Sequence, residues 1–170
     1  ANKKTSQKGS FLGPNYNSEE IKNYLENSKI KFSAFESEEK LLNEITNLII
    51  KEKIIGLFRG RMEFGPRALG SRSIIADPRS EKMQQTMNMK IKYRESFRPF
   101  APAVLKEHVS KYFQMDFDNP YMSFIFPVSK NIRLAVNKKE HDIRQNLMQK
   151  RSSLPAITHV DYSARIQTVD

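Results

Sequence analysis

Cysteine is absent from this chain of 170 residues, and its absence excludes several kinds of site at once. Disulfide frameworks, Cys-ligated zinc or iron–sulfur centres and thiol nucleophiles all need that residue. Without cysteine, the redox compartment stays undetermined. Apolar stretches long enough to span a membrane are also lacking, and residues 1–4 do not begin a signal peptide with an apolar core. We therefore expect a soluble cytoplasmic domain.

The familiar catalytic motifs are missing as well. The sequence contains no GxxxxGK[ST] phosphate loop, no GxGxxG after a strand, no HExxH zinc motif and no GxSxG nucleophile elbow. His108, His141 and His159 are far apart and lack the spacing of metal ligands, so no metal site is predicted. His159 is the exception of interest, because a strand predicted there would place it on the same face as Asp161.

Aromatic residues, in contrast, are plentiful, with eleven Phe and six Tyr. That is too much aromatic mass for a solvated disordered chain, and the length suits one domain. Residues 1–17 are polar and are predicted to be a lead-in, while residues 18–170 form the domain. The stretch 129–153 is rich in basic residues and poor in aliphatic ones, which is typical of a charged surface insertion.

Basic charge is concentrated in the middle of the chain. The 29 Lys and Arg residues exceed the 19 Asp and Glu residues by ten, and seven of these excess charges lie in residues 59–106. The same segment holds seven of the eleven arginines, the residue favoured for bidentate contacts to phosphate or carboxylate. The pattern favours an anionic partner, although a solvated basic face would have the same composition.

Helices are predicted where apolar residues recur at helical spacing behind a capping residue. Ser18 is expected to cap a short first helix, Ser37 a second with an apolar core face, and Ser80 a third with a methionine stripe. Such a stripe is more typical of a core than of a binding groove. A short helix is predicted at 106–113 and some helix at 139–150. The two stripes are Leu41, Leu42, Ile45, Leu48 and Ile49, and Met83, Met87 and Ile91.

Strands are predicted at short apolar or alternating stretches. The run 54–58 is continuous enough to be buried on both faces. A hairpin is expected to turn at Tyr162 and Ser163. Helices and strands are mixed throughout, so the fold class is α/β or α+β, with an open mixed sheet. The other predicted strands are 73–76, 100–105 and 121–128, and the hairpin arms are 156–161 and 164–169.

The strongest positive signal is the block 60–105, where glycine-bounded turns alternate with basic side chains. Glycines let the backbone approach a ligand closely, and cationic groups neutralise phosphate oxygens, as a polyphosphate site requires. Lys92, Arg94 and Arg98 lie within seven residues and repel one another unless something negative sits among them. That negative charge is either a ligand or a nearby carboxylate, and the residues alone leave both open. The carboxylates in question are Glu63, Asp77 and Glu95.

Two long motifs in this block resemble a known family. GRMEFGPRALGSRSIIADPR at residues 60–79 and KIKYRESFRPFAP at residues 90–102 are similar to the C-terminal domain of the NodU/CmcH-type O-carbamoyltransferases. LGP at residues 12–14 and THVDYSARIQTV at residues 158–169 extend the likeness in the same order. The resemblance covers most of residues 11–128 and 155–169.

This resemblance implies a YrdC-like fold, a twisted open mixed sheet with flanking helices whose concave face binds ATP and carbamoyl phosphate. The domain would form carbamoyl adenylate there. A separate N-terminal, Kae1-like domain would then transfer the carbamoyl group to a hydroxyl acceptor. The implied cofactors are ATP and Mg²⁺. Such a site works by positioning and charge stabilisation, and requires no protein nucleophile.

The resemblance also assigns site residues position by position. Lys92 and Arg98 would neutralise carbamoyl phosphate and the α-phosphate, and Arg67 would hold the triphosphate or pyrophosphate. Arg165 would orient the mixed anhydride. The catalytic candidates are Lys92, Arg98 and Arg67, and the predicted binding residues are Arg67, Lys92, Arg94, Arg98, His159, Asp161 and Arg165. We expect Arg67, Lys92, Arg98 and Arg165 to line one concavity.

Two departures from the family pattern change what is expected. The chain has the charged insertion at 129–153, and it ends before a later family segment with an Asn-Thr-Ser-Phe-Asn motif; the N-terminal transfer domain is missing too. We expect a domain incomplete at its C-terminus, inactive alone, with an exposed edge at its last strand through which copies self-associate. The acceptor cannot be read from these residues.

A basic RNA-binding module of YrdC-like fold, without catalysis, is the alternative function. Its basic character would suit a polyanion. RNA binding, however, favours dispersed cations with aromatic platforms, whereas the cations here lie on turns bounded by Gly and Pro. Nucleic acid is therefore not the expected partner.

Overall fold

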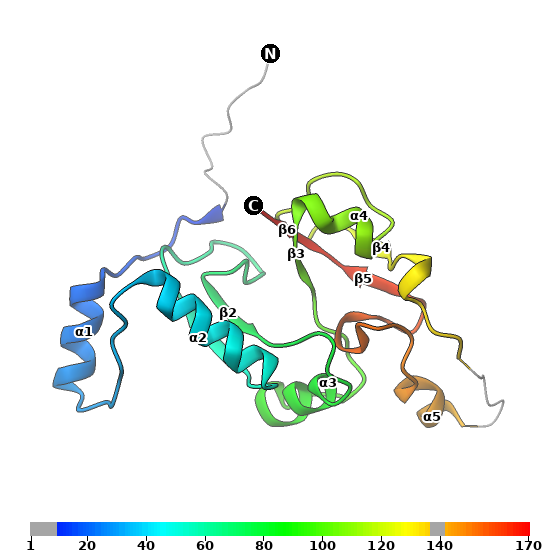
Figure 1. The fold of residues 1–170 in the computed structure, drawn as a ribbon, viewed down its shortest axis with the longest axis horizontal. Coiled ribbons are helices and arrows are strands. Elements are labelled where there is room, and N and C mark those ends of the chain that lie inside the picture. Colours follow the sequence, from blue (N-terminus) through cyan, green and yellow to red (C-terminus); the bar gives the residue numbers. More distant parts are fainter. Residues whose placement is uncertain (1–9, 137–141) are drawn as a thin grey trace, which may run out of the picture. The chain divides into compact units, whose positions relative to one another are not determined.

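The computed structural model describes residues 10–136 and 142–170. The chain divides into two compact units, Ala1–Ile75 and Ala76–Asp170. Figure 1 shows the helices and strands, and η denotes a 3₁₀ or π helix. In chain order they are α1 (Ser18–Asn27), α2 (Glu38–Ile50), β1 (Ile55–Phe58), β2 (Arg72–Ile75), α3 (Met83–Met87), η2 (Asn88–Lys92), β3 (Ala103–Leu105), η3 (Lys106–His108), α4 (Val109–Tyr112), β4 (Ile125–Pro127), η4 (Lys130–Ile132), α5 (Ile143–Met148), η5 (Pro155–Ile157), β5 (Ser163–Arg165) and β6 (Gln167–Val169).

Side-chain caps begin both helices of the first unit. At α1, Asn17 Oδ1 accepts from the Glu20 N–H at 2.9 Å and the Glu20 carboxylate accepts from the Asn17 N–H at 2.7 Å. This reciprocal capping box makes Asn17 the cap, so the prediction of Ser18 is off by one residue. The Ser37 cap of α2 is confirmed, because its hydroxyl accepts from the Lys40 N–H at 3.3 Å.

The first unit also contains an antiparallel pair, β1 and β2, with α2 packed against β1. Both strands were predicted, but burial along β1 alternates and Phe58 is 55% exposed, so burial on both faces is wrong. The predicted core stripe of α2 is wrong too, since none of the residues of that helix is buried. A two-stranded sheet with one helix offers too little apolar surface to enclose either element.

In the second unit, α3 and the π helix η2 form one continuous segment that packs on η5. Met83 and Met87 are buried, as predicted for a core stripe, whereas Ile91 is 40% exposed. The wider turn of the π helix rotates Ile91 off the buried face. Ser80 is wrong as a side-chain cap, because only its carbonyl contributes, accepting from the Met83 N–H at 3.4 Å.

Two further strand pairs share the C-terminal segment (Figure 1). β5 pairs antiparallel with β4, and β6 pairs parallel with β3; Ile166 alone separates β5 from β6. The predicted hairpin of 156–161 and 164–169 is therefore wrong. Pro155 starts the helical turn η5 where the first arm was expected.

These pairs make the fold a mixture of α and β elements, as expected. Across the described residues the strands form three two-stranded sheets and not one open sheet. The short helix predicted at 106–113 is confirmed as η3 followed by α4. The strand predicted at 121–128 is reduced to β4. No helix in the described ranges is long and apolar enough to cross a membrane.

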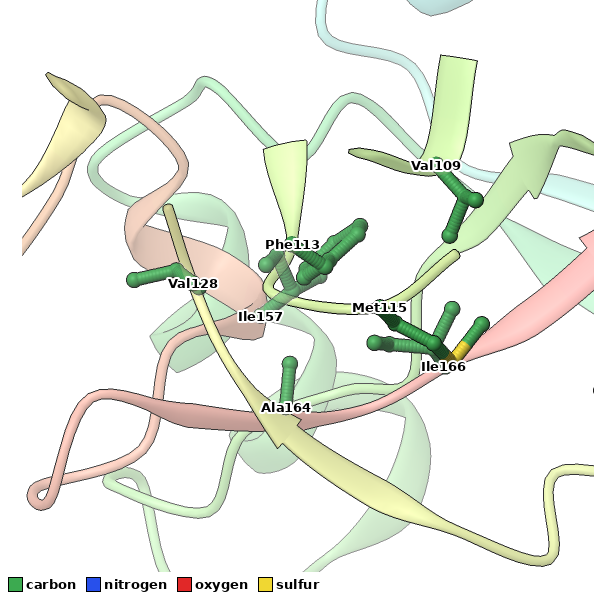
Figure 2. Packing of buried hydrophobic residues seen from close by; sticks show 7 residues of the cluster. All are labelled: Val109, Phe113, Met115, Val128, Ile157, Ala164 and Ile166. Carbon is green, nitrogen blue, oxygen red and sulfur yellow. The ribbon is translucent and has the colours of Figure 1, made fainter. Parts of the chain in front are cut away.

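A compact apolar cluster holds the second unit together, and Figure 2 shows its side chains. Phe113 is 2% exposed, and Val128 and Ile166 are fully buried. The cluster joins α4, the segment after it, the residue that follows β4, the helical turn η5, and β5 with the residue after it. Its members are Val109, Phe113, Met115, Val128, Ile157, Ala164 and Ile166.

The basic stretch 129–153 contains η4 and α5, while residues 137–141, including part of the helix predicted at 139–150, lie outside the described residues. Arg151 is only 8% exposed and donates to carbonyls at the end of α5, including that of Gln149 at 2.8 Å. It also donates to the Val160 carbonyl at 3.2 Å. This part of the insertion is therefore anchored to the turn that follows η5.

Candidate functional site

A pocket of about 560 Å³ in the second unit is bordered by six of the seven predicted site residues. Apolar side chains, among them Phe100, Ile125, Ile157 and Ala164, form much of the remaining wall. Ile157 and Ala164 also belong to the buried cluster, so the pocket is built directly on the core. The six residues are Lys92, Arg94, Arg98, His159, Asp161 and Arg165. What they bind stays a prediction.

Arg94 is fixed in the pocket wall by two neighbours. Its Nε donates to Asn88 Oδ1 at 2.6 Å, and its backbone N–H donates to the Asn88 carbonyl at 3.0 Å. The guanidinium carbon lies 4.8 Å from the centre of the Phe100 ring. This distance allows a cation–π contact, so Asn88 and Phe100 together hold the Arg94 side chain in one direction.

Asn88 also fixes the loop that follows. Its side chain is completely buried and donates to the Ser96 carbonyl at 3.1 Å and the Arg98 carbonyl at 2.8 Å. Sequence reasoning missed this residue because it carries no charge and stands outside the glycine turns. A signal was available, since Asn is a poor residue for a helix interior unless its amide has a specific partner.

Carboxylates neutralise only part of the pocket's positive charge. Glu95 pairs with Arg98 at 2.9 Å, but both side chains are about half exposed and such pairs are weak. In the described part of the chain, Lys92 and Arg165 make no ion pair. Of the other candidate carboxylates, Asp77 pairs with Arg79 at 2.6 Å. Of the three clustered cations Lys92, Arg94 and Arg98, the described residues therefore provide a nearby carboxylate for Arg98.

A tight turn brings His159 and Asp161 together. His159 Nδ1 lies 3.1 Å from Asp161 Oδ1, which also accepts from the Ser163 hydroxyl at 2.6 Å and N–H at 2.9 Å. The two side chains meet, as predicted, but the reason is different. The prediction placed them on one face of a strand, whereas residues 159–162 form a turn. Tyr162, at φ +67°, makes the reversal that returns Ser163 to this pair.

This turn affects the ionisation of Asp161. The Ser163 hydroxyl is the main cause that lowers the pKa of Asp161 to about 2, with the Ser163 N–H and His159 adding to it against partial burial. The carboxylate is thus ionised throughout the physiological range. It can hold one ring nitrogen of His159 and leave the other directed away from it.

Arg67 lies in the first unit, in the glycine-rich turn between β1 and β2, so its place in a common concavity stays a prediction. The turn is organised around Glu63, which is 8% exposed. Its carboxylate accepts from the N–H groups of Leu69 at 2.7 Å, Ser71 at 2.6 Å and Arg72 at 3.3 Å. Gly65 and Gly70 have φ values of +143° and +116°, which favour glycine in this turn.

Glu63 serves the backbone of this turn. Burial raises the pKa of Glu63, but hydrogen bonds from Leu69, Ser71 and Arg72 outweigh it, and the pKa lies below its usual value of 4.5. Its charge therefore stabilises the conformation of the turn that carries Arg67.

The described residues contain no group of three His, Asp or Glu side chains that could hold a metal ion. Among the residues that line the pocket, Asp161 supplies the carboxylate. With four basic side chains and one acid, the pocket can hold an anion, and its apolar wall can hold an uncharged part of the same ligand.

Comparisons with known proteins agree with the sequence motifs. The family described as carbamoyltransferase C-terminus matches residues 46–170. An uncharacterized protein of Synechocystis sp., sll1178, is 49% identical over 164 residues, which are 95% of this chain and 27% of that protein. The nodulation protein NolNO of Sinorhizobium fredii is 42% identical over 119 residues, or 68% of this chain and 15% of the relative.

A relative with an enzymatic name is the 3'-hydroxymethylcephem-O-carbamoyltransferase of Amycolatopsis lactamdurans. It is 35% identical over 127 residues, which are 75% of this chain and 20% of that enzyme. The chain thus spans about a quarter or less of the length of these curated relatives. The family match covers most of the chain, including both long motifs, and confirms the resemblance found in the sequence. The chain belongs to the carbamoyltransferase C-terminus family.

Proposed function

We propose that the pocket of the second unit binds ATP and carbamoyl phosphate and forms carbamoyl adenylate. The observation that carries the proposal is the meeting of Lys92, Arg94, Arg98 and Arg165 around one pocket with an apolar wall. A nucleotide has the same two parts, a flat base and a chain of anionic phosphates. Family membership supports the carbamoyl group as the one activated.

The proposed reaction combines ATP, carbamoyl phosphate and water to give carbamoyl adenylate, pyrophosphate and inorganic phosphate. Water first breaks the bond between the carbamoyl group and its phosphate, which releases inorganic phosphate and leaves carbamate. A carbamate oxygen then forms a bond to the α-phosphorus while the bond from that phosphorus to the bridging oxygen of the β-phosphate breaks. Pyrophosphate leaves with the electron pair of the broken bond. Lys92 and Arg98 would neutralise the reacting phosphates, and Arg165 would orient the mixed anhydride.

The role of Arg67 at the triphosphate or pyrophosphate stays a prediction, because this residue lies in the first unit. Mg²⁺ would accompany ATP, because magnesium in such sites is held largely by substrate phosphates with one or two carboxylates. Asp161 is the carboxylate of the pocket that could contribute, although Ser163 and His159 already engage one of its oxygens. We also propose that the fold is YrdC-like, which the mixed α and β content supports.

Transfer to a hydroxyl acceptor would take place on another part of a longer protein. The curated relatives are several times longer than the stretch that they share with this chain. The name of the A. lactamdurans relative describes O-carbamoyl transfer to a hydroxymethyl group, which supports a hydroxyl acceptor here. A Kae1-like transfer domain in the N-terminal part of such a protein completes the proposal, with a cytoplasmic location.

Calorimetric titration of the chain with ATP tests the proposal. We expect saturable binding, weakened about tenfold or more by Lys92→Ala or Arg98→Ala, because each removes a charge-assisted contact to phosphate. Lys111→Ala removes an exposed cation that does not line the pocket and should leave the affinity unchanged.

The same titration with a structured RNA at two salt concentrations tests the alternative. A compact nucleotide should show a shallow salt dependence, whereas neutralising many phosphates gives a steep one. Affinity for RNA far above that for ATP, with a steep salt dependence, would favour the nucleic-acid module and contradict the proposal.

A further inference from the structure

The helix that leads into the cationic loop changes its geometry at Asn88. α3 is an ordinary α-helix, and from Asn88 to Lys92 the chain continues as a π helix. It ends at Tyr93, whose φ of +49° is a left-handed value that non-glycine residues adopt at a cost of about 1–2 kcal/mol. π turns and such backbone values concentrate at functional sites, where surrounding contacts maintain them.

Asn88 supplies the contacts that maintain this ending. Its carbonyl accepts from the N–H groups of both Tyr93 and Arg94. Its amide nitrogen donates to the carbonyls of Ser96 and Arg98, and its amide oxygen accepts from Arg94 Nε. Asn88 is thus hydrogen-bonded to four residues of the loop 93–98, namely Tyr93, Arg94, Ser96 and Arg98.

The amide group suits this task better than other side chains of its size. A carboxylate would turn an oxygen toward the two carbonyls, and an aliphatic side chain would leave those carbonyls and Arg94 Nε unsatisfied. Among the described residues, in contrast, the side chain of Arg98 makes one ion pair, a half-exposed one with Glu95. The hydrogen bond from the Asn88 amide to the Arg98 carbonyl therefore fixes the backbone position from which the Arg98 side chain extends.

We propose that Asn88 is a positioning residue that presets Arg94 and Arg98 at the wall of the pocket before any ligand arrives. The inference rests on the proposed function, since it takes ATP as the ligand of these cations. A loop ordered in advance binds more tightly, because the ligand does not have to order it. Small displacements of such groups lower binding and rate by large factors.

Asn119 offers a matched control in the same unit. It is 3% exposed, its amide nitrogen donates to the Ile166 carbonyl at 2.9 Å, and its amide oxygen accepts from the Ser123 N–H at 3.1 Å. It is a buried asparagine with a comparable set of bonds, and none of its hydrogen bonds to the described residues involves a cation of the pocket. Asn119→Ala therefore shows what loss of a buried amide does by itself.

The experiment compares Asn88→Ala with Asn119→Ala by ATP calorimetry, by thermal unfolding and by the NMR signal of the Arg94 Nε–H. Both variants should lower the unfolding temperature. Only Asn88→Ala should weaken ATP binding, by about 10-fold to 100-fold at a temperature where the protein is folded. It should also abolish the slowly exchanging Arg94 Nε–H signal, and Asn88→Asp, which keeps the oxygen facing Arg94, should restore that signal.

Equal losses of affinity in the two alanine variants, or wild-type affinity in folded Asn88→Ala, would overturn the inference. If Asn88→Ala does not fold, the wild-type protein decides: its Arg94 Nε–H must exchange slowly without ATP, and rapid exchange contradicts presetting. If the wild type binds no ATP while the Arg94 signal depends on Asn88, the proposed function fails and the positioning of Arg94 stands.

Discussion

The two units of this chain are stabilised in different ways. In residues 76–170, seven apolar side chains form a buried cluster beneath the pocket. In residues 10–75 no apolar side chain is buried, and the buried positions are Glu63 and Ser71. The second unit as a whole therefore depends on apolar packing, whereas the turn that carries Arg67 depends on a buried carboxylate. The stability of the second unit should therefore fall when a buried apolar side chain is made smaller. The stability of the turn that carries Arg67 should fall when Glu63 loses its charge.

The largest expected effect is a cavity in the second unit. Phe113→Ala should lower the free energy of unfolding by about 3–5 kcal/mol, because Phe113 is 2% exposed and its neighbours cannot fill the space. Urea unfolding followed by circular dichroism measures this change. Leu42 of α2 is 49% exposed, so Leu42→Ala should change the free energy of unfolding by about 0.5 kcal/mol or less. Comparable losses from the two substitutions would remove the distinction between the units.

A smaller effect is expected when the carboxylate of the first unit loses its charge. Glu63→Gln should destabilise the turn by about 1–3 kcal/mol, since Glu63 accepts backbone hydrogen bonds from three residues. Hydrogen exchange of the Leu69 and Ser71 amides reports on this turn. Both amides should exchange faster in the variant, while those of the second unit stay as they are.

Protonation of Glu63 at acidic pH should destabilise the turn as Glu63→Gln does. Its pKa is lowered in the folded state, so its contribution is complete above the usual value of 4.5 and is lost as pH falls through the lower, folded value. Exchange of the Leu69 amide, corrected for intrinsic rates, should accelerate as pH falls below 4.5 in the wild type, but Glu63→Gln should remove this dependence. An unchanged pH profile in the variant would contradict the role given to Glu63.

The smallest effect concerns Asp161 in the second unit. Its folded pKa of about 2 means that its contribution is present above its ordinary pKa of 3.8 and disappears as pH falls through about 2. The side chain is 64% exposed, so solvent screening keeps the gain in stability small. NMR titration of the carboxyl carbon should give a midpoint near 2 in the wild type and a midpoint closer to 3.8 in Ser163→Ala. Equal midpoints would show that Ser163 does not hold this carboxylate.

Local signals predicted the first unit well. Ser37, Glu38 and Glu39 mark the start of α2, and the glycines between β1 and β2 mark the turn, because both depend on neighbours in sequence. Burial of these elements could not be predicted in the same way. An apolar stripe predicts the face that would be buried, but only the rest of the structure supplies surface to bury it.

In the second unit, the strand pairing was the feature that could not be predicted from local sequence. Alternation in 156–169 predicted a hairpin, yet β5 pairs with β4 and β6 with β3, because strand partners are chosen by distant segments. Charge and motif nevertheless identified the side chains that border the pocket. Asn88 escaped notice because its importance lies in bonds to residues six to ten positions ahead, which become visible only once the π helix brings them together.

The most direct test of the proposed site is to map ATP on the chain by NMR chemical-shift changes. We expect the largest changes at Lys92, Arg98 and Arg165, with smaller changes at the His159 ring, and little change at the control position Lys111. Saturation of these changes with one ATP per chain would support the pocket as the nucleotide site. Changes confined to other surfaces, or spread evenly over exposed lysines without saturation, would contradict it.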